Sequence, residues 1–192
     1  MHRLASAFVL GYHGCDQTVA DDVLAGLVMK PSSNDYDWLG EGIYFWEANP
    51  RRGLEWAKER SASGKSSITT PAVVGAVIDL GLCLDLTTSD AIEWVKAAHS
   101  ALEKIYTAAG NPMPKNSKDG LRRNLDCAVL NVLHEIRQDT AKEPIQTVRG
   151  VFIEGKPIYS NSDFFEKTHI QIAVRDAECI KGIFRVPESH LA

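Results

Sequence analysis

Six short apolar runs, separated by turn-forming residues, constrain the fold of this chain more than any other feature of the sequence. Each run is rich in β-branched residues and is bounded by glycine, proline or polar residues, which is the pattern of a β-strand. They are segments 6–13, 72–80, 82–86, 148–155, 168–174 and 181–186. Because helical patterns do not alternate strictly with these runs, we expect an α+β fold with a mainly antiparallel sheet.

Two helices are predicted early in the chain. Thr18 is placed to cap a helix whose apolar residues Val19, Val23, Leu24 and Leu27 share one face. Asn49 followed by Pro50 has the form of a cap and first turn for a second helix.

Two longer helices are predicted in the middle of the chain. In the first, Asp90 and Glu93 resemble a capping box, and the face that follows is formed by Ile92, Val95, His99, Leu102 and Tyr106. The second begins at about Ser117, and its stripe is formed by Leu121, Leu125, Ala128, Val132 and Ile136. We therefore expect one domain over residues 1–192, with a helical insertion at about 89–140.

Composition and charge exclude several classes of protein. With 44% hydrophobic and 24% charged residues the chain has an ordinary globular profile. A formal net charge of −4 argues against nucleic-acid binding by bulk electrostatics, although basic residues gather at Arg51, Arg52, Lys115, Lys118, Arg122 and Arg123.

The apolar run near the start is too short for a signal peptide, and no stretch has the length of a membrane span. The four scattered cysteines predict a cytoplasmic location and no metal site.

Residues 38–47, "WLGEGIYFWE", combine a glycine-pinched turn with a dense aromatic cluster. The two glycines allow the backbone to bend closely around a ligand. Tyr44 offers a ring for stacking and a hydroxyl for orientation, and Trp56, on the following helix, is placed to supply an opposing face. We interpret Phe45 and Trp46 as core.

Two further places put polar side chains at strand ends. His13 follows an apolar run and is followed by Gly14, where a ligand can approach the backbone; a hydrogen-bonded turn is the plainer interpretation. Cys15 next to it suggests a nucleophile, but side chains two apart on a tight turn rarely meet. In the strand 168–174, alternation places His169 and Gln171 on the face opposite the core, where they are suited to line a cleft.

Together these stretches resemble the ADP-ribosyltransferase superfamily, in the branch with a His-Tyr-Glu triad that includes the poly-ADP-ribose polymerases. The segments that carry the resemblance are "YHG" (12–14), "LGEGIYFWE" (39–47), "VIDLGLCLDL" (77–86) and "THIQIAVRDAECIKGIFRV" (168–186). Their order agrees across nearly the whole chain. The string "EKTHIQI" (166–172) is also similar to bacterial proteins, some of which belong to toxin or phage-defence systems.

The resemblance implies a split sheet that binds NAD as co-substrate. His13 would bond the adenosine ribose and Gly14 would hold the nicotinamide carboxamide by its backbone. Tyr44 would stack on nicotinamide, and Trp56 would stand near the place of the second stacking aromatic, with one residue inserted.

The chain departs from the family at the third triad position, where Gln171 stands in place of Glu. In the family this Glu bonds a ribose hydroxyl and favours the oxocarbenium-like state. A glutamine accepts the same bond without the charge, a loss of about 3–4 kcal/mol, or roughly two to three orders of magnitude in rate. Glu166 is the nearest alternative carboxylate, but its parity is wrong unless a bulge or loop intervenes.

The resemblance therefore implies mono-ADP-ribosyl transfer from NAD to a macromolecular acceptor. The basic residues 115–123 favour RNA or DNA over protein as that acceptor, and the toxin-like similarity implies a neutralising protein partner. Gln171 also suits a second hypothesis, a module that binds NAD or ADP-ribose without turnover. RNA 2′-phosphotransfer ranks last, because its His-Arg-Arg pattern is absent.

Overall fold

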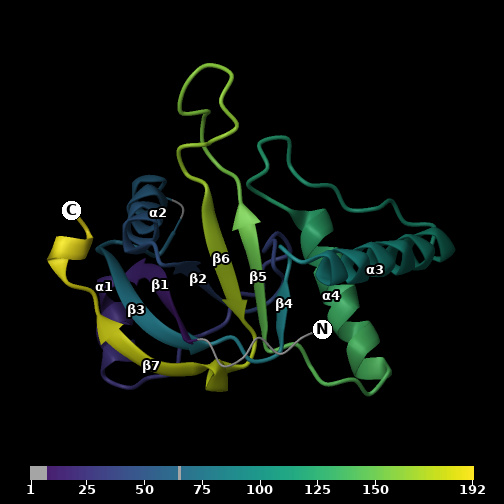
Figure 1. The fold of residues 1–192 in the computed structure, drawn as a ribbon, viewed down its shortest axis with the longest axis horizontal. Helices are drawn as coiled ribbons and strands as arrows, with labels where there is room; N and C mark the ends of the chain where they lie inside the picture. The colour runs from purple at the N-terminus through teal and green to yellow at the C-terminus, as the bar shows by residue number, and fades with distance from the viewer. Residues whose placement is uncertain (1–7, 65) are drawn as a thin grey trace.

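One seven-stranded sheet organises the part of the chain that the computed structural model describes, residues 8–64 and 66–192. The strands are β1 (Phe8–Asp16), β2 (Ile43–Glu47), β3 (Pro71–Asp79), β4 (Cys83–Asp85), β5 (Thr147–Phe152), β6 (His169–Val174) and β7 (Ile180–Arg185). Their order is β4-β5-β6-β2-β1-β3-β7 (Figure 1), and only the β4–β5 pair is parallel. The predicted α+β fold with a mainly antiparallel sheet is confirmed.

The sheet narrows where β1 meets β2. These strands pair only at Gly11–Glu47 and Tyr12–Trp46. By contrast, β1 pairs with β3 along all nine of its residues, from Phe8 to Asp16, and β2 pairs with β6. From His13 onwards the two halves of the sheet are no longer joined by a β-ladder.

The helices cover opposite faces of the sheet. They are α1 (Gln17–Leu24), α2 (Pro50–Ala62), α3 (Ser89–Ala108) and α4 (Asn124–Asp139), with short 3-10 turns at Ala177–Cys179 and Glu188–His190. One core, with Phe45, Ile78 and Ile172 fully buried, lies on the face that α1 covers. On the other face α2 packs against β1 and β3, while α3 and α4 enclose a second core around Leu84, Leu130 and Val148.

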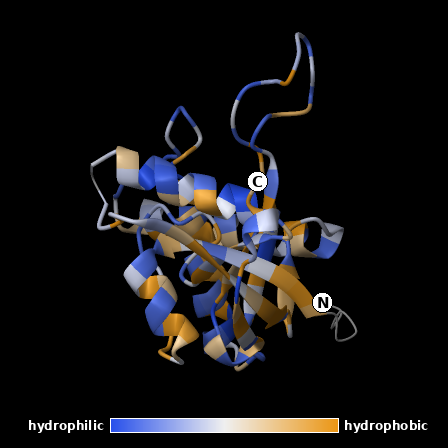
Figure 2. Cartoon of the chain, turned by 90° about the vertical axis from the view of Figure 1, so that its left-hand side faces the viewer, coloured by the Kyte–Doolittle hydropathy of each residue, from blue (hydrophilic) through white to orange (hydrophobic). Residues whose placement is uncertain are grey.

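The figures agree with this division. Figure 1 shows α2 and the α3–α4 pair at opposite ends of the sheet, with β5 and β6 between them and the loop 153–168 projecting beyond the strands. In Figure 2 the hydrophobic colour follows the strands, whereas the helices are banded with polar residues.

Three of the predicted helix starts are wrong, and one is confirmed. Asn49 caps α2 through the N–H of Arg52, as expected. The cap of α1 is Asp16 rather than Thr18, because the Asp16 carboxylate accepts hydrogen bonds from both Thr18 and the distant loop 69–70.

The insertion helices also begin elsewhere. Thr88, not Asp90, caps α3, and Glu93 pairs with Lys96 instead of closing a capping box. The second helix begins at Asn124 rather than near Ser117, since Ser117 and Asp119 close a turn through hydrogen bonds to each other and to the N–H of Leu121.

The predicted apolar stripes are partly wrong. Ile92, Leu121 and Ile136 are exposed, and Leu27 lies beyond the end of α1. Much of the α3–α4 packing is supplied by residues outside the predicted stripes: Ala91, Ala98, Val129, Leu130 and Leu133.

We predict that Asp16→Asn lowers the free energy of unfolding at pH 7 and weakens its dependence on pH below 4. Hydrogen bonds from the backbone N–H groups of Thr70, Thr18 and Thr69, and from the Thr18 hydroxyl, hold the pKa of Asp16 below its ordinary value. A depressed folded pKa contributes stability above the unfolded pKa, which is lost as the pH falls through the folded pKa. Urea unfolding at pH 7 and pH 3 measures the difference.

The exposed Asp22 supplies the matched control, Asp22→Asn, on the same helix. If Asp16→Asn and the wild type lost equal stability between the two pH values, the role given to this carboxylate would be wrong.

Candidate functional site

The Gly-Glu-Gly turn at 40–42 is fixed by the hydroxyl of Tyr44. This hydroxyl accepts a hydrogen bond from the N–H of Leu39 at 3.0 Å and donates to the carbonyl of Gly40 at 2.8 Å. Gly40 has φ of +77°, which favours glycine. Burial raises the pKa of Tyr44, so the hydroxyl stays protonated and keeps both hydrogen bonds to the turn. The ring is then the part of the side chain that is left to contact a ligand.

Close packing explains both glycines of the turn. A Cβ at Gly40 would lie 3.1 Å from Oδ1 of Asn131 on α4, and one at Gly42 would lie 3.0 Å from the carbonyl oxygen of Val174 on β6. The glycines therefore bring the turn against the insertion helix and the neighbouring strand.

His13 closes the point where β1 and β2 separate. Its Nδ1 lies 2.8 Å from the carbonyl oxygen of Tyr44; since a carbonyl only accepts, Nδ1 carries the hydrogen. Burial lowers the pKa of His13, which favours the neutral ring. Two residues that the sequence assigns to one site are thus joined directly.

The edge of β1 beyond this point faces the gap. Ala48 donates its N–H to the carbonyl of Leu10, so by alternation Tyr12 and Gly14 also direct their backbone groups towards β2. Tyr12 pairs with β2, but Gly14 does not. The N–H and C=O of Gly14 are therefore free of a β2 partner, as binding of an amide ligand requires.

Helix α2 approaches Gly14 very closely. A Cβ at Gly14 would lie 2.1 Å from the carbonyl oxygen of Gly53 and 3.3 Å from the ring of Trp56. Trp56 thus lies beside Gly14, but the ring it contacts is that of Trp46 and not that of Tyr44, which it was expected to oppose.

A row of aromatic rings crosses this face of the sheet. Trp56 lies 5.4 Å from Trp46, Trp46 lies 6.1 Å from His169, and His169 stacks on Phe152 at 5.4 Å between ring centroids. Trp38 meets Phe152 at 5.1 Å. We call these five rings the aromatic row.

Trp46 does not pack in the same core as its neighbour Phe45. Phe45 belongs to the core on the α1 face, but Trp46 lies in the aromatic row on the opposite face. It is 3% exposed, yet its indole N–H has no hydrogen-bond partner in the described part of the chain. The interpretation of Trp46 as simple core is therefore incomplete, because alternation along β2 places the two rings on opposite sides.

Gln171 is held in one orientation by Trp38. The indole Nε1–H of Trp38 donates to Oε1 of Gln171 at 2.6 Å. An indole nitrogen only donates, so the atom facing it must be the amide oxygen. The amide nitrogen of Gln171 has no protein partner among the described residues and is left to face a ligand.

Several buried polar atoms along the aromatic row lack hydrogen-bond partners within the described residues. They are Nε1 of Trp46, Nε and Nη1 of Arg52, and Nε2 of His169. His169 directs Nδ1 to the carbonyl of Lys167, so its neutral ring presents Nε2 as an acceptor; burial lowers the pKa of His169. An unsatisfied buried polar group costs about 1–3 kcal/mol, and a polar ligand would satisfy this set.

Arg52 is buried here rather than part of a basic surface. Its Nη2 pairs with Glu154 at 2.9 Å, and Lys167 pairs with Glu59 at 2.8 Å. These ion pairs tie α2 to the base of the 153–168 loop.

Glu166 lies in that loop, apart from Gln171. It is exposed, and its carboxylate accepts the N–H of Lys156 at 3.3 Å. The structure thus brings His13, Gly14, Tyr44, Trp56, His169 and Gln171 into one region and leaves Glu166 on the projecting loop.

Sequence reasoning gave no role to Trp38 or Phe152, and it assigned Arg52 and Arg123 only to clusters of basic residues. The signal for Trp38 was its place directly before the glycine turn. Arg52 carried no such signal, since nothing in its neighbourhood predicts that it pairs with Glu154, 102 residues away.

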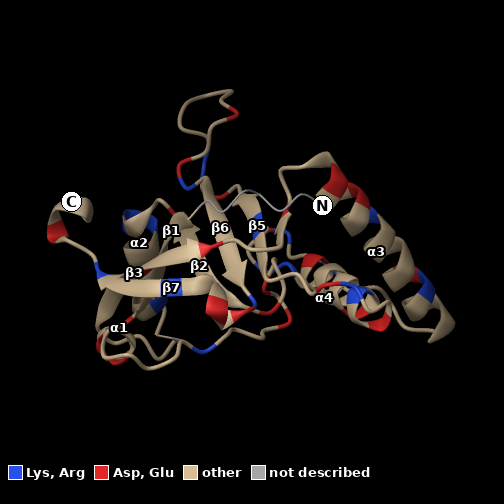
Figure 3. Cartoon of the chain, turned by 60° about the horizontal axis from the view of Figure 1, so that its bottom comes forward, with Lys and Arg blue, Asp and Glu red and all other residues tan. Residues whose placement is uncertain are grey.

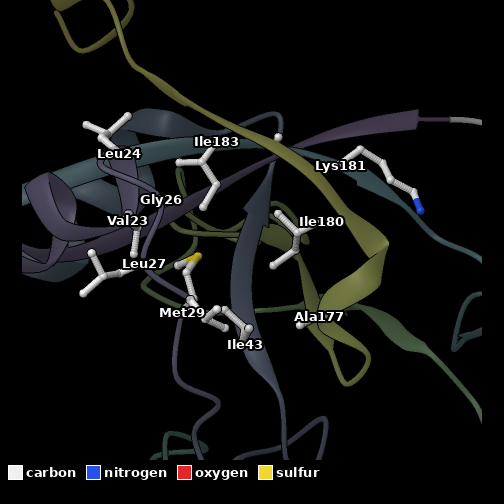
Figure 4. A pocket seen from close by; sticks show the side chains of 12 residues that line it. Val23, Leu24, Gly26, Leu27, Met29, Ile43, Ala177, Ile180, Lys181 and Ile183 are labelled. Carbon is white, nitrogen blue, oxygen red and sulfur yellow. The ribbon is translucent and has the colours of Figure 1, made fainter.

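Two cavities lie near the sheet. One of about 380 Å³, on the α1 face, is lined by apolar side chains that include Val23, Leu27, Met29, Ile43 and Ile180, with Lys181 extending away from them (Figure 4). It includes none of the predicted site residues. The other, of about 480 Å³, lies between α3 and α4 and is bounded by Trp38 and Arg123.

Other chemistries find less support in the described part of the chain. No group of three or more His, Cys, Asp or Glu residues there is arranged to hold a metal ion. Burial raises the pKa of Cys15 to about 11, so its thiol is a poor nucleophile. No helix within residues 8–64 and 66–192 has the length and apolarity needed to cross a membrane.

Comparison with known proteins shows a distant similarity. An uncharacterized protein of Methanocaldococcus jannaschii is 25% identical over 191 residues, which cover 90% of this chain and 84% of that protein. No protein-family model and no solved structure matches the chain.

We predict that Gly14→Ala destabilises the fold by about 1–3 kcal/mol or more, because its Cβ overlaps the carbonyl of Gly53 and the interior is overpacked. Gly182→Ala on β7 is the control, since a Cβ there meets nothing within 4 Å. Urea denaturation of both variants measures the effect; equal midpoints would show that α2 does not rest on Gly14.

Proposed function

We propose that this protein is an NAD-dependent mono-ADP-ribosyltransferase that modifies a macromolecular acceptor. The observation that carries the proposal is the separation of β1 from β2 at His13. It leaves Gly14 without a partner on β2, beside a sheet face that carries Tyr44, Gln171 and a set of polar atoms that lack partners within the described residues.

Each residue has a role that its position permits. The backbone of Gly14 is suited to hold the carboxamide of nicotinamide. The ring of Trp56 lies beside Gly14, and Tyr44 is on β2, across the gap between the strands. His13 uses Nδ1 to hold the carbonyl of Tyr44, which leaves Nε2 as the atom that can meet a ribose hydroxyl. The orphaned groups of Arg52, Trp46 and His169 are suited to the oxygens and hydroxyls of a dinucleotide.

The reaction breaks one bond and forms one. The bond between C1′ of the ribose and the nicotinamide nitrogen breaks, and its electron pair leaves with neutral nicotinamide. An acceptor oxygen or nitrogen then bonds to C1′ of the oxocarbenium-like ribose, and the proton of the acceptor passes to water.

Gln171 limits this reaction. Trp38 occupies its amide oxygen, so the group left for the ribose is an N–H donor, which supplies no negative charge to the cationic state. The same observation favours a second candidate function, an NAD- or ADP-ribose-binding module with little turnover.

The proposed function also includes an acceptor, a cellular role and a protein partner. We favour RNA or DNA over protein as acceptor, and a role as a toxin or phage-defence effector restrained by a neutralising protein. All four cysteines are free thiols, which suits a reducing cytoplasm.

Incubation with NAD labelled in its adenine half, together with a cell lysate, tests the proposed function. Transfer predicts a labelled macromolecule and released nicotinamide, and nuclease or protease sensitivity of the label identifies the acceptor. NAD binding by calorimetry without nicotinamide release would instead support the binding module, and absence of both would exclude the two functions together.

We predict that Gln171→Glu raises the rate of nicotinamide release by about two to three orders of magnitude. One carboxylate oxygen would keep the bond from Trp38, and the other would bring negative charge towards the ribose. Steady-state release of nicotinamide measures the gain, with NAD affinity measured in parallel. An unchanged rate in a variant that still binds NAD would contradict the role of this position.

The variant Glu166→Gln tests whether the alternative carboxylate, rather than Gln171, fills the third role. Because Glu166 lies on the projecting loop, we predict that its loss changes the rate of nicotinamide release less than twofold. A loss of a hundredfold or more would transfer the third role from Gln171 to Glu166.

A further inference from the structure

The cavity between α3 and α4 shares a wall with the proposed reaction site. Its volume of about 480 Å³ is within the usual range for small-ligand pockets. Its floor is apolar, with Leu86, Val95 and Val129 among its residues, and its wall nearest the sheet is the indole of Trp38.

Trp38 connects the cavity to Gln171. Its Nε1–H bonds the Gln171 amide, while its ring borders the cavity. The guanidinium of Arg123 lies 5.1 Å from the ring of Trp38 and 4.4 Å from that of Phe152. The Nη2 of Arg123 forms no hydrogen bond within the described residues. Flat π-surfaces of this kind stack well with other flat rings.

The position of the cavity sets it apart from the NAD side of the site. In the sheet order β5-β6-β2-β1, Gly14 lies on β1 and Tyr44 on β2, whereas Trp38 and Phe152 contact each other beyond β6. Gln171 therefore lies between the place proposed for nicotinamide and the cavity. An acceptor that attacked C1′ from the side opposite the departing nicotinamide would therefore approach from the side of the cavity.

The charges at the rim favour a neutral ring over a free phosphate. Lys96 pairs with Glu93 at 2.6 Å, His99 lies 3.7 Å from Glu103, and Arg123 lies 3.8 Å from Asp126. Figure 3 shows both signs of charge on α3 and α4. The rim thus offers compensated donors and acceptors, which match the polar edge of a nucleobase.

We infer that this cavity binds one base of a single-stranded nucleic-acid acceptor, stacked against Trp38 and Arg123, and thereby places the neighbouring sugar or base near Gln171. The inference rests on the proposed function, because it assigns the acceptor of that reaction. Stacking of bases on aromatic side chains is the usual means by which proteins hold single strands.

Binding of fluorescein-labelled single-stranded RNA and DNA, each of about eight nucleotides, tests the inference in the absence of NAD. Ser100 is exposed on α3 and lines the cavity, so Ser100→Trp fills its mouth without disturbing the core. The matched control is Ala97→Trp, at an exposed position of the same helix outside the cavity. Circular dichroism checks that both variants are folded.

We expect Ser100→Trp to weaken binding of at least one oligonucleotide about tenfold or more and Ala97→Trp to change it less than twofold. Equal affinities for the wild type and Ser100→Trp, or no binding to either oligonucleotide, would overturn the inference. If AMP or NAD bound to this cavity and the oligonucleotides did not, the base in the cavity would belong to the donor. That result would also overturn the inference.

The result of the oligonucleotide-binding test does not depend on whether the protein turns over NAD. A protein that binds oligonucleotides through this cavity but releases no nicotinamide would contradict the proposed function and leave the binding site standing. A protein that releases nicotinamide but binds no oligonucleotide would do the reverse.

Discussion

The hydrogen bond from His13 to the carbonyl of Tyr44 is the contact on which the arrangement of the site depends. Where β1 and β2 stop pairing, the carbonyl of Tyr44 loses its ladder partner, and a buried carbonyl without a partner is costly. The imidazole replaces that partner at 2.8 Å. The two halves of the sheet can therefore separate while the strand that carries Tyr44 and Trp46 stays in register with β6.

Much of this arrangement follows from residues close in sequence. β-Branched runs identified six of the seven strands of the described residues, because strands covered on both faces are nearly continuous apolar segments. The exception is β2, which the sequence presented as an aromatic cluster after a glycine turn. Alternation also placed His169 and Gln171 on the face opposite Ile172. The helix starts were less predictable, since the cap of α1 depends on Asp16 also binding Thr69 and Thr70, more than fifty residues away.

The partners within the site were not predictable from the sequence. The orientation of the Gln171 amide is set by Trp38, 133 residues earlier in the chain. Likewise, the ring that Trp56 meets is decided by how closely α2 rests on Gly14. Such contacts depend on the relative position of whole elements, and no local pattern records them. The glycines of the turn illustrate the point: they serve packing against Asn131 and Val174 as much as access for a ligand.

The loop 153–168 is anchored at its base and free at its tip. Arg52 and Lys167 hold the base through Glu154 and Glu59, whereas Tyr159 and Phe164 near the tip are exposed. A partner protein that bound the tip would therefore act first on the buried guanidinium of Arg52. Through Arg52 it would act on α2, whose Gly53 lies against Gly14. The loop is thus linked to the edge of β1 by a continuous series of contacts through Glu154, Arg52 and Gly53.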